Sequence, residues 1–488
     1  MSSAIPRHLL PPEDDGYRTP TIEDLENDHA HRRAQVASVR DDESNIPPQL
    51  RSQLLADEAP RAPRRDDSSD VTDGKMKLNL NWKQRIKHFT WTFYLLTMAT
   101  GGVANVIHSV PFRFTGLYAI GCAIFIFNIV LFILVTVGIS LRFYFYPFKF
   151  RESFMHPTES LFIPASVVSF GTILMNISQY GVESTGPWLN TGVMILYWLE
   201  CLLATVSSCV IYLILWSTQS FTIHRMTPVW IFPAYPLLII GPHAGTLSLT
   251  QPQPHSLSII VGGVILQGIG FMVAFTIYSA FIYRLMTQKL PKEALRPGMF
   301  VSVGPSGFTV TGLILMAANL TRSFPPSFMG DGALAAFVLK IVANWVGIWL
   351  WGLAVWFFIV SVGAHWSCLG HGGLHFSLTW FSFVFPNTAL VTATLAVGKA
   401  FSTRALQIVG TAMAAVLVLV WACVFVCMLR AIVRKEVLWP QMGEDKDEGG
   451  FKGGDSDGDW KRRSSQAGEE TKEKEKDKEG KERGEKMC

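Results

Sequence analysis

Long hydrophobic stretches recur along the chain and predict ten membrane-spanning helices. About 20 apolar residues are needed to cross roughly 30 Å of hydrocarbon. Stretches of this kind lie at 89–110, 117–145, 160–180, 190–217, 228–250, 257–286, 300–320, 334–363, 376–398 and 406–433. The odd-numbered stretches begin 71, 68, 72 and 76 residues apart, so the repeating unit is one helical hairpin. The expected fold is an all-α membrane protein of five repeated helical hairpins around a central pore.

The odd and even spans differ in their helix-breaking residues. The even spans contain no proline, whereas the odd spans carry clusters of glycine, proline and small hydroxyl residues. A broken helix in a bilayer is tolerated where it faces protein or a water-filled path. We therefore expect the odd helices to line the pore and the even helices to surround it, although glycine and proline also serve close helix packing. The expected pore-lining residues are Thr100, Gly101, Gly102, Pro164, Pro242, His243, Gly304, Pro305, Ser306, Asn387 and Thr388.

Composition supports a membrane protein with two polar tails. The chain is 49% hydrophobic and 16% charged, against about 25% charged in soluble domains. Residues 1–80 and 439–488 are polar and are expected to be disordered, because they have too little apolar surface to offset the entropy of ordering. The transporter domain is expected over residues 81–438. The seven cysteines fall mostly within spans and predict buried thiols, with no disulfide framework.

The distribution of lysine and arginine predicts the orientation. Sixteen of these residues flank the spans on the side of the two termini, and four flank them on the opposite side. The positive-inside rule then places both termini in the cytoplasm. The four opposite residues are Arg113, Arg322, Lys399 and Arg404. We expect a cationic outer rim that attracts anions, with Arg296 at the cytoplasmic mouth, although simple surface solvation is an alternative.

Two ionisable residues within spans are candidates for proton coupling. A charge inside a bilayer is costly, so each such residue is a functional candidate. Glu200 lies in the fourth span, where a packed, protonated carboxyl is an alternative to proton transport. His243 lies in the fifth span, and its ordinary pKa of about 6.5 suits coupling to acid media. A neutral, hydrogen-bonded histidine fits that position equally well.

One short segment resembles a metal site. His365, Cys368, His371 and His375 have a spacing like that of metal ligands. Two glycines follow His371 and argue against presentation on a helix. We expect neither a metal nor a cofactor.

Several strings resemble one family of transporters. They are FTWTFYLLTMATGGVANVI at 89–107, PFRFTGL at 111–117, HPTESLFI at 156–163, TQP at 250–252, RPGMFVSVGP at 296–305 and WFSFVFPNTAL at 380–390. Their order and spacing resemble the tellurite-resistance/dicarboxylate transporter family, which includes fungal malic acid permeases, sulfite efflux pumps and plant slow anion channels. The similarity covers roughly residues 80–435 and is greatest to the malic acid permeases.

The resemblance implies a pore, a gate and a trimer. In this family a phenylalanine in the ninth span plugs the pore just before a proline, and the matching residues here are Phe385 and Pro386. An apolar ring at that place closes a narrow path by dewetting it, while a plain core aromatic is the alternative. The family also implies a homotrimer and passage of anions, with no covalent chemistry and therefore no enzyme activity.

The expected function is transport of C4-dicarboxylates, malate first and also succinate, across the plasma membrane of a fungal-type cell. Proton symport and efflux of the anion both fit the sequence. A sulfite efflux pump or another small-anion channel of the same fold is the nearest alternative. A seven-helix receptor fits ten spans poorly. An embedded hydrolase or acyltransferase would need a His/Asp or paired-carboxylate constellation near a membrane face, whereas only one span carries an acidic residue at depth. The expected partners are the anion and the lipid bilayer, with no nucleic acid.

Overall fold

The computed structural model describes residues 81–182, 185–219, 223, 226–366 and 376–438. All regular elements in these ranges are helices, so the prediction of an all-α protein is confirmed. The two tails that were predicted to be disordered lie outside the described residues. Two short helices, α3 (Trp82–Ile86) and α6 (Phe148–Met155), precede the first inner helix and the second one.

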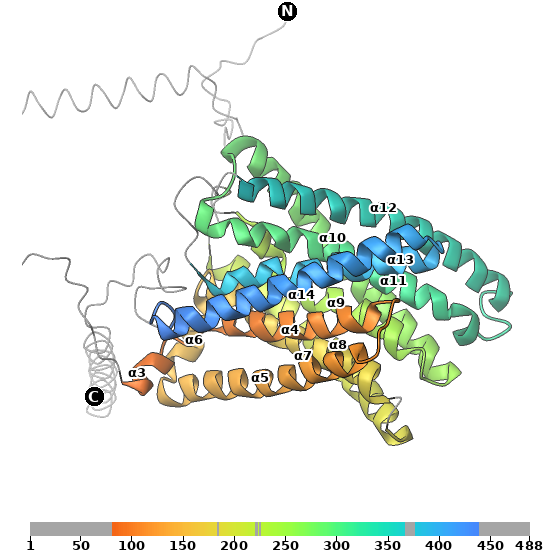
Figure 1. Cartoon of the computed structure of the whole chain (residues 1–488), viewed down its shortest axis with the longest axis horizontal. Coiled ribbons are helices and arrows are strands. Elements are labelled where there is room, and N and C mark those ends of the chain that lie inside the picture. Colours follow the sequence, from red (N-terminus) through yellow and green to blue (C-terminus); the bar gives the residue numbers. More distant parts are fainter. Residues whose placement is uncertain (1–80, 183–184, 220–222, 224–225, 367–375, 439–488) are drawn as a thin grey trace, which may run out of the picture. The chain divides into compact units, whose positions relative to one another are not determined.

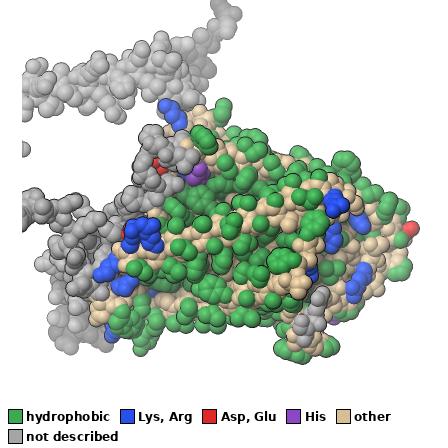
Figure 2. Space-filling view, in the orientation of Figure 1, with side chains coloured by type: hydrophobic (Ala, Val, Ile, Leu, Met, Phe, Trp, Pro, Cys, Tyr) green, Lys and Arg blue, Asp and Glu red, His purple; other side chains and the backbone are tan. Residues whose placement is uncertain are grey.

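Five long helices form the outside of the protein. They are α5 (Leu117–Phe145), α8 (Pro187–Thr218), α10 (Gln253–Gln288), α12 (Gly332–Trp366) and α14 (Arg404–Val433). Only 22–39% of the residues in their most apolar stretches are buried. The visible face is correspondingly hydrophobic along its middle, with lysine and arginine gathered toward its two ends (Figure 2). Such a surface suits lipid, and these helices coincide with the even spans.

Five shorter helices form the inside, and each follows a 3-10 segment. The pairs are η2 (Trp91–Phe93) with α4 (Tyr94–Ser109), η3 (Glu159–Phe162) with α7 (Ala165–Asn176), η7 (Pro228–Ala234) with α9 (Tyr235–Leu247), η8 (Glu293–Ser302) with α11 (Val303–Ser323), and η9 (Leu378–Phe383) with α13 (Phe385–Ala400). Every residue of α9 except Thr246 is buried, as is every residue of α4 except the last two. These helices coincide with the odd spans.

The inner helices close into a ring. Helix α4 packs against α7, α7 against α9, α9 against α11, and α11 against α13, while α13 returns to α4. Each outer helix packs against the inner helix that precedes it in the chain and against the inner helix that follows it. The last outer helix, α14, packs instead against α13 and the first inner helix, α4. Figure 1 shows α5, α14 and α12 running along the outside of the bundle. The ring therefore joins segments from both ends of the described chain.

Within the described residues, eight helices are long and apolar enough to cross a membrane. The other two predicted spans fall at α4 and α9, which have 16 and 13 residues. Each of these two helices alone is shorter than the roughly 20 residues that a span requires, and each continues a 3-10 segment, η2 or η7. The repeat of five hairpins that makes ten spans thus remains a prediction.

The prolines of the inner spans stand mainly at helix starts, which differs from the expected breaks within spans. Pro164 is the N-cap of α7, Pro236 and Pro386 are the second residues of α9 and α13, and Pro305 is the third residue of α11. The first four N–H groups of an α-helix have no intrahelical partner, so a proline there costs no hydrogen bond. These prolines mark the change from 3-10 to α-helix. Pro242 differs, because it lies inside α9.

Glycines allow the inner helices to touch along their backbones. A Cβ atom on Gly307 of α11 would lie 2.8 Å from the carbonyl carbon of Ala389 in α13. A Cβ atom on Gly312 would lie 2.9 Å from the carbonyl carbon of Gly241 in α9. Small residues at such crossings permit the close approach that holds membrane helices together.

We predict that Gly307→Ala lowers the stability of the purified protein by about 1–3 kcal/mol, because the added methyl group overpacks a backbone contact. Thermal unfolding in detergent measures the change. Gly352→Ala on α12 is the matched control, since its added Cβ would meet nothing within 4 Å. It should leave the midpoint unchanged or raise it slightly. Equal midpoints for both variants would contradict this packing.

Candidate functional site

Three aromatic side chains from three inner helices meet inside the ring of helices. Phe385, the first residue of α13, is 1% exposed. Its ring centroid lies 5.2 Å from that of Phe308 in α11 and 6.1 Å from that of Tyr235 in α9. From α4, a Cβ atom on Gly102 would come within 3.3 Å of the Phe385 ring. We call Phe385, Phe308 and Tyr235 the aromatic plug.

A hydrogen bond and a glycine hold Tyr235 in the aromatic plug. Its hydroxyl donates to the carbonyl of Val301, at the end of η8. A Cβ atom on Gly304 would lie 2.8 Å from the ring carbon that bears this hydroxyl, so only glycine leaves the space. On its other side, the Tyr235 ring stacks on Phe232 with centroids 5.1 Å apart. The expected pore-lining Gly304 thus shapes the plug through Tyr235.

The three consecutive residues expected to line the pore on α4 face three different neighbours, because successive helical residues are about 100° apart. Thr100 accepts a hydrogen bond from the Trp421 indole of α14 at 3.1 Å. Gly101 faces α7 and α5, since its Cβ would lie 2.5 Å from the Thr172 hydroxyl and 2.7 Å from the Asn128 amide nitrogen. Gly102 faces α13, since its Cβ would lie 2.9 Å from the side chain of Thr388. Of the three, Gly102 is the one that the structure places beside the aromatic plug.

The other expected lining residues are buried in the inner helices. Thr388 donates to the carbonyl of Phe385 at 2.6 Å, and Asn387 donates to that of Phe383 at 2.8 Å. Pro386 follows Phe385 in the first turn of α13. The carbonyl of Pro305 accepts from the Thr309 hydroxyl at 2.7 Å. The next residue, Ser306, is fully buried. Pro164 begins α7, and the backbone of Pro242 lies against Gly312 of α11.

Sequence reasoning missed four residues near this centre. Tyr235 and Phe308 complete the aromatic plug, and Thr311 of α11 lies 3.1 Å from Thr392 of α13, hydroxyl to hydroxyl. A signal for Thr392 was available, because it stands four residues after Thr388 and therefore on the same helix face. The two aromatic residues carried no signal of their own among 33 phenylalanines and 11 tyrosines.

The two proton-coupling candidates are brought together in one buried pair. His243 Nδ1 lies 2.6 Å from Glu200 Oε2, and both side chains are at most 1% exposed. On the other side of the imidazole, Nε2 lies 3.4 Å from the hydroxyl of Ser178 in η4 (Ile177–Gly181), a π-helical turn after α7. These contacts direct the imidazole toward α8 and η4, and its place in the pore lining stays a prediction.

The cationic candidates lie near helix ends. Four of them are exposed. Arg113 follows α4, Arg322 lies in the last turn of α11, Lys399 lies in the last turn of α13, and Arg404 begins α14. Arg113 donates to the carbonyl of His108 at 3.0 Å, and Arg322 donates to that of Leu249 at 2.6 Å. Arg296 is half-buried and donates to the carbonyls of Pro291 and Ala364 at 3.1 and 3.2 Å. Its guanidinium therefore fastens η8 to the end of α12.

The described residues contain no group of three or more histidine, cysteine or acidic residues that could hold a metal ion. His365, at the end of α12, donates from Nδ1 to the carbonyl of Ser361 at 2.7 Å. Cys368, His371 and His375 of the metal-like segment lie outside the described residues.

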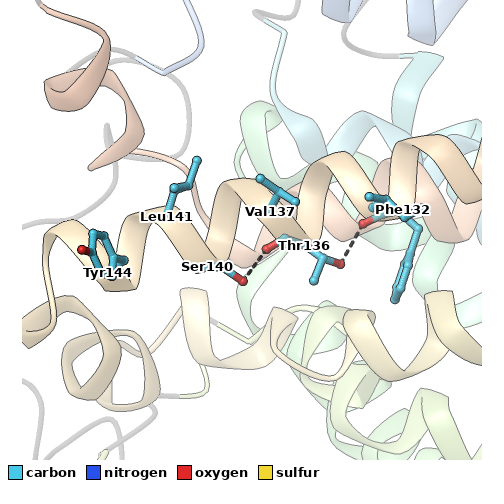
Figure 3. Close-up of a pocket in the computed structure, with 7 residues that line it drawn as sticks. Phe132, Thr136, Val137, Ser140, Leu141 and Tyr144 are labelled. Atoms are coloured by element: carbon cyan, nitrogen blue, oxygen red, sulfur yellow. Dashed lines mark hydrogen bonds between the residues drawn. The ribbon is translucent and has the colours of Figure 1, made fainter.

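A pocket on the surface of α5 has the character of a lipid contact (Figure 3). It is lined by Phe132, Ile133, Thr136, Val137, Ser140, Leu141 and Tyr144. The hydroxyls of Thr136 and Ser140 each donate to the carbonyl one turn earlier at 2.7 Å. The hydroxyls of Thr136 and Ser140 are therefore bonded within the helix, and the remaining lining is apolar except for the hydroxyl of the exposed Tyr144.

Comparison with known proteins identifies a group of transporters and channels. A family model described as voltage-dependent anion channel matches residues 88–429. A malic acid transport protein of Schizosaccharomyces pombe is 33% identical over 365 residues, which are 75% of this chain and 82% of the relative. A putative malic acid transport protein of the same organism is 31% identical, over 74% of this chain and 84% of that protein. A sulfite efflux pump of Arthroderma benhamiae is 26% identical, over 72% of this chain and 93% of the pump.

We predict that Tyr235 and Gly304 are energetically coupled. Tyr235→Phe should destabilise the protein by about 1 kcal/mol through the lost hydrogen bond, and Gly304→Ala should destabilise it by about 1–3 kcal/mol through overpacking. The double variant should lose at least about 0.5 kcal/mol less than the sum, because removing the hydroxyl makes room for the methyl group. Thermal unfolding of all four proteins measures this difference.

Tyr212→Phe is the control for the cycle. Its hydroxyl also donates to a carbonyl, that of Trp230 at 3.0 Å, but from the outer helix α8. Its effect should add to that of Gly304→Ala without coupling. Strict additivity for Tyr235 as well would rule out the contact on which the aromatic plug depends.

Proposed function

The chain belongs to the voltage-dependent anion channel family, and we propose that it transports C4-dicarboxylates, malate first and also succinate, across the plasma membrane. The family and the relatives are transporters and channels, so the chain is a multi-pass membrane protein that moves anions and catalyses no covalent reaction. Two relatives that are 31–33% identical are described as malic acid transport proteins, one of them putatively. These descriptions support malate as the substrate.

The observation that carries the proposal is the position of Phe385. It lies within a closed ring of five buried helices, and its own ring meets residues of α4, α9 and α11. An apolar obstruction in a narrow path excludes water and with it any hydrated anion. We infer that Phe385 is the gate, that Pro386 fixes the start of its helix, and that Tyr235 and Phe308 hold the closed state.

Uncharged polar groups are proposed to line the path next to the gate. Thr311 and Thr392 bring their hydroxyls together between α11 and α13, and Thr388 lies beside Gly102 of α4. Each of these hydroxyls donates to a carbonyl of its own helix in the structure and would rotate to donate to a carboxylate oxygen. Gly102 would let an anion approach the backbone of α4. The exposed Arg113, Arg322, Lys399 and Arg404 would raise the concentration of a dianion at one mouth.

Assembly and orientation complete the proposal. We infer that both termini are cytoplasmic, as the distribution of lysine and arginine favours. We also infer a homotrimer in which part of the apolar outer surface faces neighbouring copies and part faces lipid. Transport is proposed to be linked to protons, which suits uptake of a dicarboxylate from acid media.

Sulfite efflux is the second candidate function. The relative described as a sulfite efflux pump matches over 93% of its own length, although it is only 26% identical to this chain. Its similarity to the whole helical region means that the fold alone does not separate the two substrates.

Uptake of labelled L-malate into transport-deficient yeast that expresses the protein tests the proposal. We expect uptake above the empty-vector level, competition by succinate, and a higher rate at about pH 4 than at about pH 6.5. We expect Phe385→Ala to raise the rate several-fold, because it removes the apolar obstruction. Sulfite transport without malate transport would contradict the malate proposal and favour sulfite efflux.

Phe357→Ala is the matched control for the gate. Phe357 is also 1% exposed and packs against Tyr278 with centroids 4.5 Å apart, but it belongs to the outer helix α12. Its truncation opens a comparable cavity outside the ring and should lower stability without raising uptake. An equal rise for both variants would contradict a specific gate at Phe385.

A further inference from the structure

One structural feature recurs in the first three inner helices. Gly101 of α4, Gly171 of α7 and Gly241 of α9 follow one another at intervals of 70 residues. At each of them, a polar side chain of the following outer helix lies within 2.7 Å of the position that a Cβ atom would take, together with Thr172 of α7 at Gly101 and Ile239 of α9 at Gly171. The side chains from the outer helices are Asn128 of α5, Glu200 of α8 and Gln267 of α10. Two of the three positions therefore hold a neutral amide, and the third holds a carboxyl group.

The Gln267 position shows what a neutral side chain achieves there. Its oxygen accepts from the N–H of Gly241 at 3.1 Å, and its nitrogen donates to the hydroxyl of Thr309 at 2.8 Å. The amide thus ties the outer helix to two inner helices without any charge. Since an amide suffices for this structural task, the carboxyl group of Glu200 needs a different explanation.

The bonding of Glu200 is incomplete. Its Oε2 faces His243 Nδ1 at 2.6 Å, while its Oε1 lies against Gly171 and has no hydrogen-bond partner. The side chain is fully buried. An unpartnered carboxylate oxygen in a dry interior is costly, and binding a proton removes that cost.

We propose that Glu200 and His243 form a single proton-binding site, and that the proton carried with the substrate binds there. This inference rests on the proposed function and names the site of its proton linkage. With one shared proton the pair has no net charge, whichever of the two groups holds it. A second proton, taken up from the aqueous phase with Oε1 as the available acceptor, gives the pair a net charge of +1.

The described residues that contact the pair are uncharged. From α8, Tyr197 packs edge-on against His243 with centroids 5.2 Å apart, and Cys201 adjoins Glu200. From η4, Ser178 offers a hydroxyl to the imidazole. From α10, the carbonyl of Ile259 accepts from Tyr197 at 3.2 Å. Neither Tyr197 nor Cys201 is charged at neutral pH, so the second proton changes the local charge outright.

The pair touches two walls of the ring. His243 belongs to α9, and Ser178 belongs to the π-helical turn that ends α7. The neighbouring Pro242 lies against Gly312 of α11. A positive charge at this place, in a medium of low dielectric constant, stabilises a dianion in the adjacent path far more than it would in water. Departure of the dianion removes that stabilisation and releases the second proton.

Purified full-length protein in liposomes that contain a pH-sensitive dye tests this site. With wild type, inward transport of malate should acidify the interior. The double variant Glu200→Gln/His243→Gln removes both bases and places at 200 the residue already found at 267. Any malate transport that it retains should have lost both malate-driven acidification and stimulation by acid.

Glu152→Gln is the control. Glu152 is a partly exposed carboxylate, 2.8 Å from Lys149, and its loss should leave malate-driven acidification unchanged. Malate transport by Glu200→Gln/His243→Gln with full acidification would overturn the proposed site, as would transport by wild type without acidification. Absence of malate transport by wild type would overturn the proposed function itself, so the two failures are distinguishable. Should this double variant fail to fold, Glu200→Gln/His243→Asn also removes both bases and decides in its place.

Discussion

Close contact between the backbones of the inner helices is the constraint on which the rest of the structure depends. In a bilayer, lipid competes with apolar side chains, so helices associate through close packing and hydrogen bonds. Gly307 meets Ala389, Gly312 meets Gly241, and Gly245 meets the backbone of Met316, each at a place where a side chain would overlap its neighbour. These contacts draw the ring tight enough for a few aromatic side chains to fill its centre.

The outer helices complete the ring by supplying hydrogen bonds as well as apolar surface. Every outer helix directs a polar group at an inner helix: Asn128, Glu200, Gln267, Trp351 and Trp421. The indoles of Trp351 and Trp421 donate to Thr394 and Thr100 at 2.9 and 3.1 Å. Such bonds stabilise a membrane protein by roughly 0.6 kcal/mol each. Their larger effect is to fix the rotation of each outer helix about its axis.

The sequence predicted the two layers well, because composition and helix breakers report directly on exposure to lipid. The predicted span 117–145 coincides with α5, and the odd spans became the buried helices. Helix starts were predicted less well, since proline was interpreted as a break within a span. Pro305 and Pro386 stand instead in first turns, where a missing N–H costs nothing.

The site was predicted only in part, because the direction of a side chain depends on packing. Glu200 and His243 were both identified as buried ionisable residues, but their contact joins two helices and was invisible in the chain. Thr100 and Gly101 were expected in the path, yet Thr100 faces α14 and Gly101 faces α7 and α5, since a helix turns by 100° at each residue. Phe385 was found through family resemblance, and its partners Tyr235 and Phe308 followed only from the fold.

The proposed pore requires that the ring of inner helices closes between α4 and α13. Disulfide formation between Gly102→Cys and Thr388→Cys tests that closure most directly. A Cβ atom on Gly102 would lie 2.9 Å from the Thr388 side chain, although the two residues are far apart in sequence. In a chain without its native cysteines, mild oxidation should link the two positions within one molecule, so that fragments cleaved between them stay joined until reduction. Absence of this link in folded protein, or links formed only between molecules, would contradict the closed ring.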